Sequence, residues 1–203
     1  MRYWTGVLVL LLGAVAMADV ERIPLERAQQ IAKLLQEQVA KVGDLQFKPD
    51  VDTEKPSGIH AENKYGAMVI PDRNLGEDTF TKASKTEVTP IGHLWTRNLA
   101  PAVDGTVTPN AKLRLVGVPI EGNEHNLPFY LLGLRKNPDG KLILLVYGKD
   151  KDPLVKVPLE RAEKTPGVPI EVDGKKGENE TGILILNLLG KYEARITVKE
   201  QEQ

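Results

Sequence analysis

Two neighbouring segments of this chain, residues 127–135 and 141–148, are apolar on both of the faces that a β-strand presents. Side chains alternate between the two faces of a sheet, and here both sets consist largely of Leu, Ile, Val, Phe and Tyr. The intervening Asn137-Pro138-Asp139-Gly140 has Pro and Gly in favourable turn positions. The pattern predicts a hairpin in the middle of the structure, covered on each side.

Further strands are predicted before and after this hairpin. Apolar runs at 66–70, 88–97 and 112–120 precede it, and 77–83 predicts a helical turn. Segments 154–159 and 168–172 follow it and contain prolines, which favours sheet edges. Such spacing, with Gly, Pro, Asn and Asp between the strands, indicates an antiparallel β-sandwich of seven or eight strands over residues 65–203.

The last predicted strand has the clearest alternation in the chain. One face is apolar and the other polar, which predicts one buried and one solvated side. The closing pair, 181–187 and 191–199, resembles the end of an immunoglobulin-like or transthyretin-like module. The two faces consist of Tyr192, Ala194, Ile196 and Val198, and of Lys191, Glu193, Arg195, Thr197 and Lys199.

Residues 19–43 contain the one strong helical period. Apolar residues recur at intervals of three and four and form a single stripe between Ala28 and Val42. Two interpretations stay open, a helix that docks a partner and a helix that packs on its own β-core, and we favour the second. The following residues, 44–64, are predicted to be a polar connector.

The first eighteen residues predict export. Arg2 is followed by the apolar run 7–12, and Ala16-Met17-Ala18 provides the small residues of a cleavage site, so that Asp19 would begin the mature chain. The chain has no cysteine, which excludes disulfides, a thiol nucleophile and the attachment site of a lipoprotein. We therefore expect a periplasmic or secreted protein without a membrane span in its mature part.

Charge and motifs exclude several classes of function. Without the signal, 26 basic residues stand against 28 acidic ones, and no basic cluster predicts binding to nucleic acid or anionic lipid. Ser57 and Ser84 are the only serines, and neither lies in a Gly-x-Ser-x-Gly turn. No glycine-rich phosphate loop follows a strand, and the sequence names no cofactor.

Metal binding is the more specific alternative. The three histidines are His60, His93 and His125, and carboxylates lie close to two of them, at Glu62 and Glu124. Loops from separate segments can converge at one end of a sandwich. Their spacing does not match a zinc motif, so we interpret His60 and His125 as ordinary surface residues.

Trp95 and His93 are predicted to share one strand face with Ile91. They could form a small binding pocket, although core packing is the better interpretation for a large aromatic ring. Taken together, the pattern predicts an exported, non-enzymatic β-sandwich module with an N-terminal helix. It would bind or scaffold envelope or extracellular proteins through loops or an edge strand, in an oligomeric state that the pattern leaves open. The alternative is a metal-binding protein or metal-dependent hydrolase that uses the histidines and carboxylates named above.

Overall fold

The computed structural model describes residues 20–62, 64–120 and 122–201. The predicted signal peptide, residues 1–18, lies outside these ranges. Within them the chain is mainly β, with fourteen strands, helix α1 (Leu25–Val39), the short helix α2 (Glu77–Thr81) and a single 3-10 turn at Asn110–Lys112. None of the described helices is long and apolar enough to cross a membrane.

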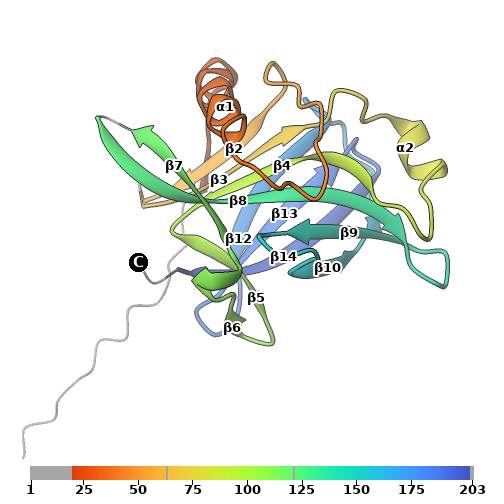
Figure 1. The fold of residues 1–203 in the computed structure, drawn as a ribbon. Coiled ribbons are helices and arrows are strands. Elements are labelled where there is room, and N and C mark those ends of the chain that lie inside the picture. Colours follow the sequence, from red (N-terminus) through yellow and green to blue (C-terminus); the bar gives the residue numbers. More distant parts are fainter. Residues whose placement is uncertain (1–19, 63, 121, 202–203) are drawn as a thin grey trace, which may run out of the picture.

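The strands form two antiparallel sheets, which Figure 1 shows stacked beneath α1. The larger sheet has the order β1-β2-β3-β4-β8-β9-β10, with β7 paired to β8. Its strands are β1 (Val20–Arg22), β2 (Ser57–Ala61), β3 (Tyr65–Pro71), β4 (Thr89–Arg97), β7 (Arg114–Ile120), β8 (Asn123–Lys136), β9 (Leu142–Tyr147) and β10 (Val155–Pro158).

The smaller sheet has the order β12-β13-β14-β5-β6, and β11 also pairs with β14. With eight and six strands, the two sheets contain more strands than the seven or eight expected from the sequence. The strands of the smaller sheet are β5 (Leu99–Val103), β6 (Thr106–Val107), β11 (Glu160–Arg161), β12 (Ile170–Lys176), β13 (Gly182–Leu188) and β14 (Tyr192–Glu200).

The two segments that are apolar on both faces form strands β8 and β9. They lie where the larger sheet is buried on both of its faces. Tyr130, Leu132 and Leu144 belong to the core shared with the smaller sheet. Phe129 and Leu145, one position out of phase, belong to a second core beneath α1. The hairpin prediction is confirmed, with its turn at 137–140.

Helix α1 packs on the outer face of the larger sheet. Its residues Ala28, Ala32, Leu35 and Val39 are buried in the second core. The helix is shorter than predicted because it ends at Val39, and the backbone turns left-handed only at Asp44, where φ is 52°. The self-packing interpretation of the apolar stripe agrees with this burial.

The predicted polar connector, 44–64, is wrong in its second half. Residues Ser57–Ala61 form β2, an internal strand between β1 and β3. The β-structure therefore begins before residue 65, at Val20. The sequence Ser-Gly-Ile-His-Ala has too few apolar residues to show alternation, and the strand is defined by its pairing with β3.

The first half of the connector is held against β7. The guanidinium of the buried Arg114 donates to the carbonyls of Gly43 and Asp44, each at 3.3 Å, and to Oε1 of Gln46 at 2.9 Å. Burial lowers the pKa of Arg114. The α1 layer is thereby fixed to the larger sheet at both the helix and the segment that follows it.

The alternation predicted for β14 is confirmed on its apolar side, where Ala194, Ile196 and Val198 are fully buried. Glu193 differs from the prediction, since it is 8% exposed. Lys164 and Arg195 each donate to its carboxylate at 2.8 Å. These contacts, the one to Lys164 foremost, lower the pKa of Glu193 and keep it charged.

Candidate functional site: an unpaired stretch of strand β8

Strand β8 has different neighbours along its two edges. One edge pairs with β7 from Asn123 to Phe129 and continues along β9 from Leu131. The other edge pairs with β4, and that pairing ends at Trp95 opposite Phe129. Residues 123–128 of β8 therefore have no strand on the β4 side in the part of the chain that the structure describes.

Two hydrogen bonds at the far end of β8 show which residues face each edge. The N–H of Asn137 donates to the carbonyl of Lys141 at 2.8 Å, on the β9 side. The N–H of Lys136 donates to the carbonyl of Ser84 at 2.8 Å, on the side of the segment that leads into β4. Because backbone groups alternate between the edges of a strand, even-numbered residues of β8 face β4. At the unpaired stretch these residues are Glu124, Asn126 and Pro128, of which Pro128 has no N–H.

Glu124 and Asn126 each present one N–H and one C=O to the open side. Both residues are exposed. The pairing of β4 with β8 does not extend to these four groups, and the pairing of β7 with β8 lies on the other edge. The four groups form a short sheet edge of the kind to which a further strand can be added.

The chain leaves this edge open because β4 turns away. Asn98 adopts a left-handed conformation with φ 55°, and the hydroxyl of Thr96 donates to the carbonyl of Leu99 at 2.6 Å. The chain then enters β5 in the smaller sheet. Pro128 lies on β8 where pairing with β4 stops, and it has no N–H to offer.

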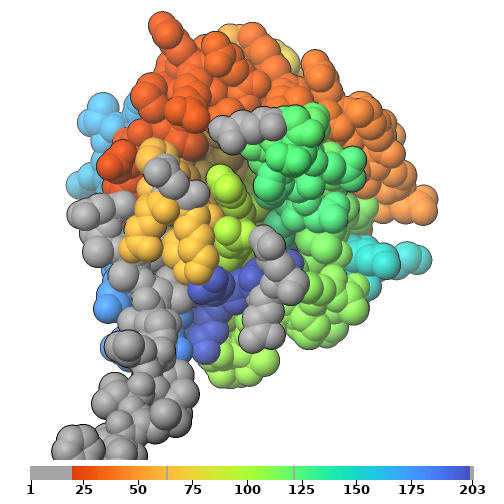
Figure 2. Space-filling model, turned by 90° about the vertical axis from the view of Figure 1, so that its left-hand side faces the viewer, coloured from red at the N-terminus to blue at the C-terminus, as the bar shows by residue number. Residues whose placement is uncertain are grey.

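The β7–β8 hairpin stays in place because its other face is packed. Val116 and Val118 of β7 are buried in the core beneath α1. Figure 2 shows the hairpin on one side of a recess, the β2 and β3 strands on the other side, and the end of β4 on its floor. The open edge of β8 is therefore one wall of this recess.

The β3 side of the recess carries a cluster of charges that is largely neutralised. Lys64 forms an ion pair with Glu200, and the hydroxyl of Tyr65 donates to Oε2 of Glu200 at 2.8 Å. The Lys64 ammonium also lies 4.9 Å from the centre of the Tyr65 ring. The hydrogen bond from Lys64, followed by that from Tyr65, lowers the pKa of Glu200.

His93 and Trp95, the predicted pocket pair, lie together beneath α1. They are 1% and 2% exposed, and their rings contact Phe129 with centroids 4.9 and 4.8 Å apart. Neither nitrogen of His93 nor Nε1 of Trp95 has a hydrogen-bond partner among the described residues. Burial lowers the pKa of His93 to about 3, so the ring is neutral at physiological pH.

Ile91 does not share the face of His93 and Trp95, contrary to the sequence prediction. The pairing of β4 with β8 shifts between Pro90 and Gly92, which is a β-bulge. Ile91 consequently points into the core between the sheets. Gly92 has φ +149°, and a Cβ there would lie 2.4 Å from the carbonyl oxygen of Ile70, so the bulge requires glycine.

The other predicted metal residues occupy separate strands and a turn. His60 lies on β2, where Nε2 is 3.6 Å from a carboxylate oxygen of Glu21. Glu62 lies in the β2–β3 turn, and Glu124 and His125 lie on β8 across the recess. Among the described residues, no three His, Asp or Glu side chains gather in an arrangement that could hold a metal ion.

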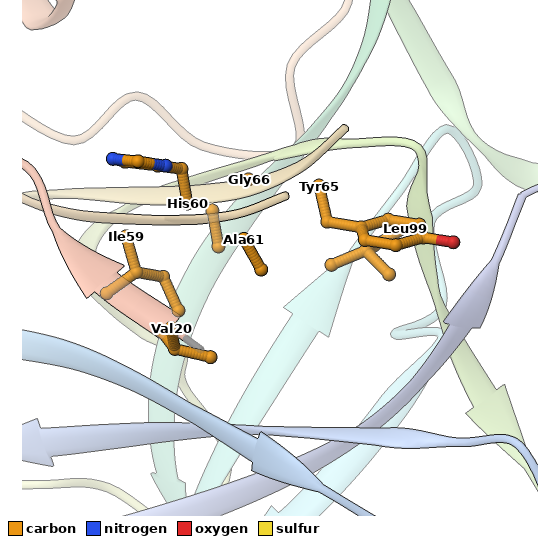
Figure 3. Close-up of a pocket in the computed structure, with 8 residues that line it drawn as sticks. Val20, Ile59, His60, Ala61, Tyr65, Gly66 and Leu99 are labelled. Atoms are coloured by element: carbon orange, nitrogen blue, oxygen red, sulfur yellow. The ribbon is translucent and has the colours of Figure 1, made fainter. Parts of the chain in front are cut away.

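Two hollows lie elsewhere on the described part of the molecule, and neither is lined by residues of β8. The first, between β1–β3 and Leu99, is too small for a water molecule. Figure 3 shows Val20 and Ile59 pointing into it and His60 pointing away. The second has a volume of about 450 Å³ and lies between the β5–β6 turn and residues 150–154. Its lining includes Val103, Thr108, Lys112, Asp150, Asp152 and Leu154.

Comparison with protein-family models gives no match, and neither do comparisons with curated proteins and with solved structures. The open edge was not anticipated from the sequence, although a signal was present. Pro119 and Pro128 interrupt two otherwise pairable segments, and proline within a strand marks a sheet edge.

Proposed function

We propose that this protein is an exported, non-enzymatic β-sandwich module that binds or scaffolds other proteins of the cell envelope or extracellular space. The observation that carries the proposal is the open edge of β8 at Glu124 and Asn126. An extended segment of a partner protein would add to this edge as a further strand. Main-chain hydrogen bonds give such complexes their affinity, and the alternating side chains give them specificity.

The contrast with other edges of the sheets supports this proposal. Along β12, the N–H of Val172 donates to the hydroxyl of Ser57 at 3.0 Å, and Arg22 lies 3.6 Å from Glu171. Along β10, Pro158 removes an N–H from the edge. Proteins commonly block sheet edges in these ways to prevent unwanted pairing. An edge with two available N–H groups suits a role in recognition.

The remaining parts of the proposal are its architecture and location. The sandwich is of immunoglobulin-like or transthyretin-like general character, supported by the antiparallel hairpin β13–β14, in which one face is fully buried. Export is supported by the apolar run and small residues before Asp19, and the absence of cysteine argues against a lipoprotein. We propose a periplasmic or secreted location.

A cross-linking experiment in the native host tests the proposal. A photoreactive amino acid replaces Glu124, and a matched control carries it at Lys156 on the outer side of β10. We expect a defined adduct at position 124 that the additional substitution Asn126→Pro abolishes, and cell fractionation should place the adduct outside the cytoplasm. Identical adducts at both positions, or an adduct that Asn126→Pro leaves unchanged, would contradict binding through this edge.

A further inference from the structure

Arg97 is the exposed cation next to the open edge. It is the last residue of β4, and it takes part in none of the ion pairs among the described residues. Its neighbours differ in this respect, since Lys64 is paired with Glu200 and His60 lies 3.6 Å from Glu21. The side of the recess next to β8 therefore has one positive charge that the described part of the chain does not neutralise.

The pairing of the strands defines the place of Arg97 relative to the edge. Glu21 pairs with His60, His60 with Gly66, and Gly66 with Arg97, so these residues form one row across four strands. Continuation of the β4–β8 register would place Arg97 opposite Leu127. Neighbouring strands lie about 4.8 Å apart, so a strand added beside Asn126 comes within reach of the Arg97 side chain.

The face of the sheet on which Arg97 lies is also defined. Trp95 points toward α1, and residues two apart on a strand share a face. Arg97 therefore lies on the α1 side of the sheet, at the outer end of β4. A carboxylate on the same face of an added strand could accept two parallel hydrogen bonds from the guanidinium, which is the strongest common geometry for such a pair.

We propose that the occupant of the edge is an extended acidic segment of another polypeptide. Its backbone pairs with Glu124 and Asn126 of β8, and an Asp or Glu side chain pairs with Arg97. This inference rests on the proposed function and specifies the chemistry of the partner. A second copy of this chain is the competing occupant, because it presents the same edge, and the test below distinguishes the two.

Synthetic peptides provide the test. The probe is acetyl-Thr-Val-Thr-Glu-Thr-Val-Thr-amide, with matched peptides in which Gln or Lys replaces Glu, and titration calorimetry measures their affinities for the chain from Asp19 onward. We expect the Glu peptide to bind at least about tenfold more tightly than the Lys peptide. Arg97→Gln should remove this preference, whereas Arg161→Gln on β11 should retain it.

Backbone pairing is tested separately. Asn126→Pro removes an outward N–H and should abolish binding, whereas Lys156→Pro removes an outward N–H from β10 and should have no effect. If Asn126→Pro fails to fold, peptides methylated at alternate backbone nitrogens replace this variant, and those with a blocked pairing edge should not bind.

Three outcomes would overturn the inference. Equal affinity for the Glu, Gln and Lys peptides would refute the acidic partner and leave strand addition intact. No binding by any of the three peptides would refute both the partner chemistry and the use of this edge. A dimer in sedimentation analysis that Asn126→Pro dissociates would identify a second copy as the occupant.

Discussion

His93 is a buried base without a hydrogen-bond partner in the described part of the protein, and this makes it a source of acid sensitivity. Its pKa is about 3 in the folded state because burial disfavours the charged ring, against 6.5 for the unmodified side chain. Between these pH values the unfolded chain binds more protons than the folded chain does. The free energy of unfolding therefore decreases as the pH falls from 6.5 to 3. The loss should approach about 4–5 kcal/mol.

His93→Leu tests this prediction. Urea unfolding of the wild type and the variant is compared at pH 7 and at steps down to pH 3, so that carboxylate titrations common to both cancel. The wild type should lose more stability than the variant over this range. Parallel pH profiles would show that His93 gains a proton without cost in the folded protein.

Truncation of Leu144 and of Thr197 to Ala should lower the free energy of unfolding by very different amounts. Leu144 is fully buried between the sheets, and Leu144→Ala should cost about 2–5 kcal/mol because the surrounding core cannot close the cavity. Thr197 lies on the outer face of β14, and Thr197→Ala should cost less than about 1 kcal/mol. Urea unfolding measures both. Equal losses would contradict the assignment of inner and outer faces.

At the scale of residues, alternation predicted most of the buried face of β14 and failed where local geometry or a distant partner intervened. Ile91 changed face because a bulge at Gly92 shifts the register by one residue. Glu193 became buried because Lys164, far along the chain, neutralises it. A two-residue period contains neither kind of information.

At the scale of elements, backbone N–H groups on the two edges of β8 should differ in their rates of hydrogen exchange. The N–H groups of His125 and Leu127 face β7 and should be protected, whereas those of Glu124 and Asn126 face the recess and should exchange rapidly. Residue-resolved NMR exchange of the unliganded protein measures this alternation. Uniform protection from 124 to 127 would mean that the edge is already occupied.

Substitutions in the apolar stripe of helix α1 distinguish self-packing from partner docking, because the two interpretations predict opposite effects on the melting temperature. Leu35 and Val39 are buried beneath the helix and Ile31 is half-buried, so Asp at all three positions would place unpaired charges against the sheet. We expect a large fall in melting temperature by circular dichroism. A control with Asp at the exposed Arg27, Gln30 and Lys33 should melt close to the wild type. An unchanged melt of the first variant would favour a docking helix.

The elements that the sequence predicted well are long or strongly periodic, such as α1, β8, β9 and β14. The prolines also placed β10 and β12 correctly at sheet edges. The strands that escaped prediction, including β1, β2 and β5, are short, and their pairing is determined by distant segments. The candidate site escaped for a similar reason, since it exists only because β4 leaves β8.

For the molecule as a whole, the two cores should unfold together. The larger sheet contributes alternate residues of the same strands to both: Leu94 and Tyr130 face the smaller sheet, while Trp95 and Phe129 face α1. Loss of either core would expose one face of β4 and β8 and would weaken the packing on the opposite face of the same strands. A single cooperative transition is therefore expected for the chain from Asp19 onward.

Two probes that report on different layers can test this coupling. Trp95 is the only tryptophan after the predicted cleavage site and lies beneath α1, so its fluorescence follows that layer. Far-ultraviolet circular dichroism follows the strands of both sheets. The two urea transitions should coincide, because neither face of the larger sheet can remain ordered when the other is exposed. A fluorescence transition at clearly lower urea would show that the α1 layer separates from an intact pair of sheets, which would make the helix a detachable element.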